Sequence, residues 1–116
     1  AVLSGARRPT ALCCGNDALA VGALAAAYEL GIRVPADLSV TGFDDVPLAA
    51  YTVPPLTTVA QPYAAMAAAA MELLLARVER RPATPSSAPV AEQEPPERRV
   101  LPVSLVQRRS AARRTG

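Results

Sequence analysis

The sequence has no Lys, no His and no Trp, and it has only one Phe and three Tyr among 116 residues. The lack of His removes the usual general base and the commonest zinc ligand. Neither a Gly-x-Ser-x-Gly motif nor a Gly-rich phosphate loop is present. Asp44 and Asp45 are adjacent, so they cannot face each other as the acid and base of a glycosidase. The sequence therefore predicts no enzyme, no catalytic residue, no metal site and no cofactor.

Cysteine is equally scarce, because the chain has only Cys13 and Cys14, side by side in an apolar run. Neighbouring residues of a strand point to opposite faces, so a disulfide between them would be strained. We expect two buried free thiols in a reducing cytoplasm. No signal peptide and no Leu-rich membrane span is recognisable, although 51% of the residues are hydrophobic. These features predict a soluble, cytoplasmic chain without a membrane partner.

All twelve basic residues are Arg, and six of them lie at or beyond Arg98. The Arg-Arg pairs there have two interpretations: a nucleic-acid-binding tail, or a solvated strand edge with a frayed end from Arg108 onward. No aromatic residue is interleaved with them, no helix-turn-helix pattern is visible, and the net charge is only +2. The sequence favours the second interpretation.

Short apolar runs alternate with helical patterns along the chain, as in an α/β protein. Gly31 is placed to end the first helix, which is apolar almost all round and should be covered on more than one side. Strand, helix and strand follow one another at the spacing of a parallel sheet. We expect strands at 9–14, 38–41, 56–60 and 100–106, helices at 18–30 and 63–80, and a helical turn at 47–51. The predicted fold class is α/β, with a parallel sheet flanked by helices that these residues supply only in part.

Polar side chains follow the first three predicted strands, where ligands of an open parallel sheet bind. Their carboxylate and amide groups can exchange hydrogen bonds with hydroxyl groups, and one aromatic ring could lie against a sugar ring. Two adjacent carboxylates would repel phosphate, so the pattern favours a neutral, hydroxyl-rich ligand. The candidate ligand-binding residues are Asn16, Phe43, Asp44 and Gln61.

Each candidate also has a purely structural interpretation, which the local sequence leaves open. The polar pairs at 16–17 and 44–45 would then only cap the helical segments that follow them. Phe43 would be a core side chain, and Gln61 would be a boundary residue before a proline.

Four segments in order carry a resemblance to a known family. They are Cys-Gly-Asn-Asp-Ala-Leu-Ala-Val-Gly-Ala-Leu at 14–24, Gly-Ile-Arg-Val-Pro-Ala-Asp-Leu-Ser-Val-Thr-Gly-Phe-Asp-Asp at 31–45, Pro-Leu-Thr-Thr-Val-Ala-Gln-Pro at 55–62, and Leu-Pro-Val-Ser-Leu-Val-Gln-Arg-Arg-Ser at 101–110. Together they resemble the sensing domain of lac-repressor-like (LacI/GalR) transcriptional regulators. The chain departs from the family pattern at Ala67, where Gly is usual, and in its long Pro-rich segment.

The resemblance implies a partial periplasmic-binding-protein-like (type I) fold with two lobes joined by three crossings, two of them near 60–62 and 101–103. It implies that a small effector, expected to be a sugar, contacts Asn16, Asp44, Gln61 and Phe43. It also implies a homodimer that binds operator DNA through a headpiece that these residues do not contain. The implied organisation is residues 1–60 in the C-terminal lobe, 61–81 as a helix of the N-terminal lobe, 82–97 as a flexible Pro-rich linker, and 98–116 as a returning strand with a frayed tail.

Two other functions stay open at this point. A sugar-binding protein of a transport system would share the fold, and the chain could also be a non-functional gene remnant. The motifs at 31–45 and 55–62 favour the regulator. A helix-turn-helix upstream of residue 1 would support the regulator, whereas an export signal would support the transport protein.

Overall fold

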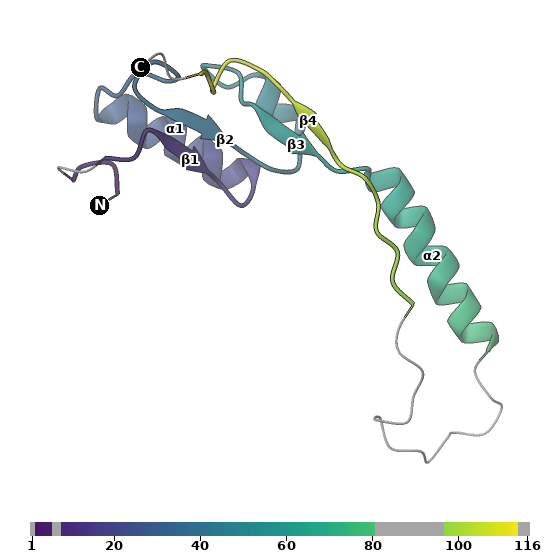
Figure 1. Ribbon diagram of the computed structural model, residues 1–116. Coiled ribbons are helices and arrows are strands. Elements are labelled where there is room, and N and C mark those ends of the chain that lie inside the picture. The colour runs from purple at the N-terminus through teal and green to yellow at the C-terminus, as the bar shows by residue number, and fades with distance from the viewer. Residues whose placement is uncertain (1, 6–7, 81–96, 114–116) are drawn as a thin grey trace. The chain divides into compact units, whose positions relative to one another are not determined.

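The computed structural model describes residues 2–5, 8–80 and 97–113 (Figure 1). The predicted linker at 82–97 lies outside these residues, except for Glu97. The chain divides into two compact units, one made of residues 1–61 and 103–116 and the other of residues 62–102. The predicted assignment of segments to two lobes stays a prediction. The elements are β1 (Ala11–Cys13), α1 (Asp17–Glu29), β2 (Ser39–Thr41), η1 (Pro47–Ala50), β3 (Thr58–Ala60), α2 (Tyr63–Glu79) and β4 (Ser104–Val106).

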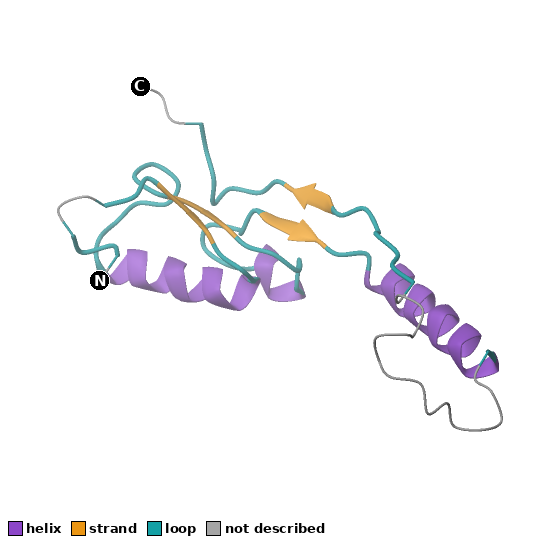
Figure 2. Ribbon diagram, turned by 60° about the horizontal axis from the view of Figure 1, so that its bottom comes forward, coloured by secondary structure: helices purple, strands orange, loops and turns teal. Residues whose placement is uncertain are grey.

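The first unit begins with a parallel strand pair and its connecting helix. β1 pairs with β2 in parallel, with Ala11 opposite Ser39 and Cys13 opposite Thr41. α1 covers one face of this pair, as Figures 1 and 2 both show. The helix ends at Glu29, and Gly31 shortly after it adopts a φ of 65° that a residue with a Cβ would resist. The predicted parallel α/β arrangement is therefore confirmed.

The carboxyl end of β2 continues into contact with β3. Thr41 bridges Thr57 and Asp44 bridges Ala60, both in the parallel direction. The amide of Gly42 donates to the carbonyl of Thr57 at 3.0 Å. β4 then pairs with the other side of β3 in the antiparallel direction, with Val59 opposite Leu105. The antiparallel direction of β4 was not foreseen from the sequence.

A small core lies between α1 and the strands. Three of its eight buried residues are Ala, whose side chain buries less apolar area than that of Leu or Ile. Gly42 belongs to this packing, because a Cβ there would lie 2.2 Å from Asp17 Oδ1 and 3.0 Å from Leu56 Cδ2. The buried apolar residues are Ala20, Leu24, Ala27, Ile32, Leu38, Val40, Ala49 and Leu56.

Two expectations about burial are wrong for the described part of the chain. α1 was expected to be covered on more than one side, but Leu19 and Tyr28 are 62% and 87% exposed. The buried residues of α1 recur at helical spacing and form one face: Asp17, Ala20, Leu24 and Ala27. The two free thiols were expected to be buried, but Cys13 is exposed and Cys14 is half-buried. Partial burial raises the pKa of the Cys14 thiol.

The second unit consists of α2 and the chain that precedes β4. The predicted helix at 63–80 is confirmed as Tyr63–Glu79, but none of its residues is buried. Arg99 forms an ion pair with Glu72 at 2.5 Å, and Arg80 lies 3.7 Å from Glu97. Both contacts are largely exposed, so each contributes little to stability. Among the described residues, no helix is long and apolar enough to cross a membrane.

Candidate functional site

A hollow lies where the carboxyl ends of β1 and β2 meet the start of α1. The two strands run parallel, so the loops that follow them emerge at the same edge of the sheet. The hollow has a volume of about 300 Å³ and is open to solvent. Of the four predicted site residues, the structure places Asn16 and Asp44 together in its wall. The lining residues are Asn16, Asp17, Ala18, Val21, Asp44, Val46 and Leu48.

Asn16 is the N-cap of α1, so its structural interpretation is confirmed. Its backbone is extended, and its Oδ1 accepts a hydrogen bond from the amide of Leu19 at 2.9 Å. The cap uses only the oxygen of the side-chain amide. The NH₂ group of the same side chain is thus a donor at the wall of the hollow, and a capping role and a ligand-binding role are compatible.

Asp44 is held by Gln61, which lies just after β3. Gln61 Nε2 donates to Asp44 Oδ1 at 2.6 Å, and the amide of Asp44 donates to the carbonyl of Val59 at 2.8 Å. Gln61 is thus more than a boundary residue, because it orients one oxygen of the carboxylate. The same amide donors and carboxylate acceptors suit a ligand that carries hydroxyl groups.

Phe43, like Gln61, is not among the described residues that line the hollow. Phe43 has a half-buried side chain. Its carbonyl accepts a hydrogen bond from the amide of Asp17 at 2.8 Å, which ties the β2 loop to the start of α1. The structure therefore shows a role for the backbone carbonyl of Phe43.

The described residues offer no metal site, since no three His, Cys, Asp or Glu side chains among them come close enough to hold an ion. The polar side chains in the described lining of the hollow are those of Asn16, Asp17 and Asp44, which can form hydrogen bonds. The site can bind and orient a polar molecule.

The chain matches the family of periplasmic binding protein-like domains over residues 1–111. It is 40% identical over 111 residues to the HTH-type transcriptional repressor PurR of Escherichia coli, which covers 96% of this chain and 29% of that protein. It is 59% identical over 69 residues to an uncharacterised HTH-type transcriptional regulator of Streptomyces limosus, covering 60% of this chain and 20% of that protein.

Solved structures of LacI-family regulators are also similar to this chain. The lac repressor dimer bound to operator and the anti-inducer ONPF is similar with a TM-score of 0.71 and 34% identity, over 89% of this chain and 32% of that chain. A LacI family transcriptional regulator from Lactobacillus casei with bound sucrose is similar with a TM-score of 0.67 and 38% identity, over 90% of this chain and 34% of that chain. The chain belongs to the effector-binding domain of the LacI family.

The chain spans less than a third of the length of the curated LacI-family relatives it matches. These relatives are transcriptional regulators, so the family is not one of enzymes, and the predicted absence of catalysis agrees with it. Because both relatives are transcriptional regulators, they favour similarity to a regulator over similarity to a sugar-binding protein of a transport system.

In this LacI-family chain, Asp17 forms long-range contacts that the sequence did not predict. Only 1% of it is exposed, and it does not cap α1 as the sequence allowed. Its Oδ1 accepts from the hydroxyl of Thr58 at 2.5 Å, and its Oδ2 accepts from the amide of Val46 at 2.9 Å. The carboxylate therefore joins α1 to β3 and to the loop after β2. No local signal indicates a partner that is 41 residues away.

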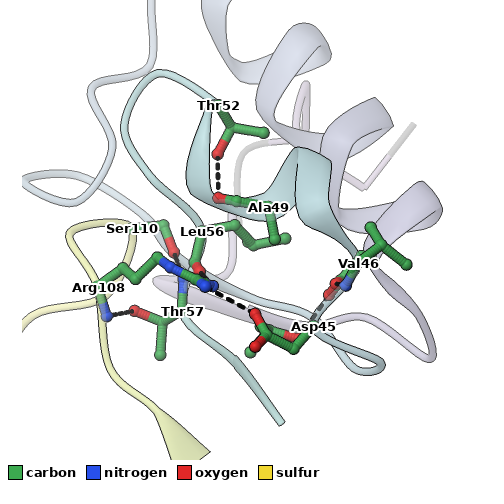
Figure 3. A network of polar contacts seen from close by, with 10 residues as sticks. Asp45, Val46, Ala49, Thr52, Leu56, Thr57, Arg108 and Ser110 are labelled. Carbon is green, nitrogen blue, oxygen red and sulfur yellow. Dashed lines mark hydrogen bonds and ion pairs between the residues drawn. The ribbon is translucent and has the colours of Figure 1, made fainter. Parts of the chain in front are cut away.

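The capping interpretation that the sequence left open for Asp45, at the turn at Pro47, is wrong. The N-cap residue of η1 is Val46, and no side chain caps it. Asp45 Oδ1 instead accepts a hydrogen bond from the guanidinium of Arg108 at 2.7 Å (Figure 3). This acidic group is therefore bound to the C-terminal segment of the chain.

The segment that follows β4 is not frayed at 108–110, contrary to the prediction. Ser110 is fully buried, and its hydroxyl donates to the carbonyl of Val40 at 2.6 Å. The same hydroxyl accepts from the amide of Thr57 at 2.8 Å (Figure 3). One side chain here satisfies a backbone carbonyl of β2 and the backbone amide of the residue before β3, which fixes the segment against the sheet.

Proposed function

We propose that this chain forms one wall of the effector site of a LacI-family transcriptional repressor. The observation that supports this most is that Asn16 and Asp44, from loops after different strands, line one hollow, with Gln61 hydrogen-bonded to Asp44. In this proposal, Asn16 and Gln61 donate to ligand hydroxyls and Asp44 accepts from them. Phe43 supports the loop and lies near the ligand.

We propose a neutral sugar as the effector. Two acidic residues, Asp17 and Asp44, line the hollow and disfavour an anionic ligand, whereas charge-assisted hydrogen bonds from hydroxyl groups to a carboxylate are strong. The hollow is lined by Asn, Asp and apolar side chains, without a basic residue among its described lining. The similar regulator of Lactobacillus casei, which was crystallised with sucrose, is consistent with this class of ligand.

The complete protein would act in the cytoplasm as a homodimer that binds operator DNA through a headpiece outside these residues. The lac repressor structure similar to this chain is such a dimer bound to operator. Effector binding would shift the balance between a form that binds DNA and one that does not.

The test is calorimetric titration of the complete protein with a panel of neutral mono- and disaccharides, including glucose and sucrose. Asp44→Ala should weaken binding of the best saccharide roughly ten- to hundredfold, since one charge-assisted hydrogen bond contributes about 1.5–3 kcal/mol. Affinity for operator DNA without saccharide should stay unchanged.

Asp37→Ala is the matched control, because Asp37 is an acidic residue of the same unit that pairs with Arg33 and does not line the hollow. It should bind saccharide as the wild type does. Loss of operator binding in Asp44→Ala with an unchanged saccharide affinity would contradict the proposal. Wild-type protein that binds no saccharide of the panel would exclude the sugar as its ligand class.

A further inference from the structure

The turn that carries Asp44 has an unusual backbone conformation. Asp44 and Asp45 have φ values of 116° and 55°, in the left-handed region that favours glycine. Two successive residues with a Cβ persist there only when the surrounding contacts hold them. The position of the Asp44 carboxylate at the hollow thus depends on whatever holds this turn.

Besides the hydrogen bond from Gln61 to the Asp44 carboxylate, three contacts hold the turn. The amide of Asp44 donates to the carbonyl of Val59 at 2.8 Å, and the amide of Val46 donates to Asp17 Oδ2 at 2.9 Å. The third contact lies between Asp44 and Val46 in the sequence: the side chain of Asp45 accepts a hydrogen bond from Arg108 at 2.7 Å. The ion pair is well shielded, with 19% of the Arg108 side chain and 25% of the Asp45 side chain exposed.

Arg108 is itself fixed before it reaches Asp45. A second guanidinium nitrogen donates to the carbonyl of Leu56 at 2.9 Å, and its backbone amide donates to Thr57 Oγ1 at 3.0 Å (Figure 3). A planar guanidinium with two acceptors has little freedom to turn away. Anchoring of the C-terminal segment to the sheet does not need this side chain, because the buried hydroxyl of Ser110 already provides it.

We propose that Arg108 is a positioning residue for the effector, which it never touches: it holds Asp45 and thereby the left-handed turn that presents Asp44. This rests on the proposed function of the hollow. The segment after β4 would then take part in effector recognition through one ion pair that extends over 63 residues of sequence.

The test uses the complete protein with Arg108→Gln, Asp45→Asn and the double variant. Arg109→Gln is the matched control, because Arg109 is the exposed neighbour of Arg108. Arg108→Gln should raise the Kd for the tightest-binding saccharide among glucose, sucrose and the rest of the panel about tenfold, as expected for a coupled pair. The double variant should be no worse than either single one, and Arg108→Lys should recover part of the affinity.

Hydrogen exchange of the Asp44 and Val46 amides gives a second readout that needs no ligand. Both amides should exchange faster in Arg108→Gln and at the wild-type rate in Arg109→Gln, because their acceptors depend on the turn. A purely structural role would lower Tm and leave the Kd and these two exchange rates unchanged, and that result would overturn the proposal.

The two proposals fail in different ways. If the wild type binds saccharide and Arg108→Gln binds it equally well, the role of Arg108 is refuted while the effector site stands. If the wild type binds no saccharide of the panel, the effector site fails, and the role of Arg108 in recognition fails with it.

Discussion

Replacing Thr58 with Val should destabilise the fold by removing one hydrogen bond from a buried carboxylate. Thr58 and Asp17 are 0% and 1% exposed, and the hydroxyl lies 2.5 Å from Asp17 Oδ1. Valine has almost the same shape as threonine, so the variant leaves no cavity and the loss is that of the hydrogen bond. The second oxygen of Asp17 keeps its bond to the amide of Val46.

The expected loss in the free energy of unfolding is about 1.5–3 kcal/mol, the contribution of a hydrogen bond to a charged group. Because only 1% of Asp17 is exposed, water replaces the lost partner of Oδ1 poorly, so the upper part of this range applies. With a urea m-value of about 1–3 kcal/mol/M, the midpoint should fall by roughly 1 M.

The assay is urea unfolding of the complete protein, followed by circular dichroism. Thr10→Val is the control, because Thr10 is exposed and its known contact, to the amide of Ser39, uses only its backbone carbonyl. The control should shift the midpoint by little. A Thr58→Val midpoint equal to that of the control would refute the claim that Asp17 joins α1 to β3.

Three further predictions follow from contacts in the first unit and from the exposed helix faces. Gly42→Ala should lower Tm, because the new Cβ would lie 2.2 Å from Asp17 Oδ1 and overpacking costs about 1–3 kcal/mol; an unchanged Tm would contradict the close approach. The hydrogen bond from the Arg33 side chain lowers the pKa of Asp37 to about 2, so any stability from this pair is present above the ordinary carboxyl pKa of about 4 and is lost as the pH falls through 2. An NMR titration should show this low midpoint, and Arg33→Gln should raise the pKa toward its ordinary range, although the bond from the backbone amide of residue 33 remains; a midpoint in the variant as low as in the wild type would exclude the side-chain pair as its main cause. Residues 1–116 alone should unfold without a sharp thermal transition and bind no sugar with useful affinity, because α2 has no buried residue and one face of α1 is exposed; a cooperative transition with saturable sugar binding would contradict this.

Much of the fold follows from local signals. α1 was predicted at 18–30 and lies at Asp17–Glu29, because Asn16 caps its start and Gly31 permits the left-handed turn after its end. The order of strands and helices follows from short apolar runs separated by Pro and Gly. These signals act within a few residues, so sequence patterns reveal them.

Long-range contacts were not predictable in this way. The bond of Asp17 to Thr58 and that of Asp45 to Arg108 join residues far apart in sequence, so the sequence offered only local capping as their structural role. The buried position of Ser110 likewise depends on strands that lie well before it. Nothing in the local sequence distinguishes a carboxylate that caps a turn from one that binds an arginine of another segment.

The candidate site is an intermediate case. Parallel strands place their carboxyl ends together, so the meeting of Asn16 with Asp44 follows from topology. The contact of Gln61 with Asp44 depends on the register of β3 beside the end of β2, which the sequence does not show. Phe43 was expected to present its ring to a ligand, and that role stays a prediction.

The most direct test of the central claim is to follow the side-chain amide resonances of Asn16 and Gln61 while the complete protein is titrated with the saccharide that it binds. Both NH₂ groups should shift in a saturable way, with the Kd found by calorimetry, because they donate to the ligand. The side-chain amide of the exposed Gln107 should not shift. Saturable binding that leaves the Asn16 and Gln61 signals in place would show that the effector lies elsewhere.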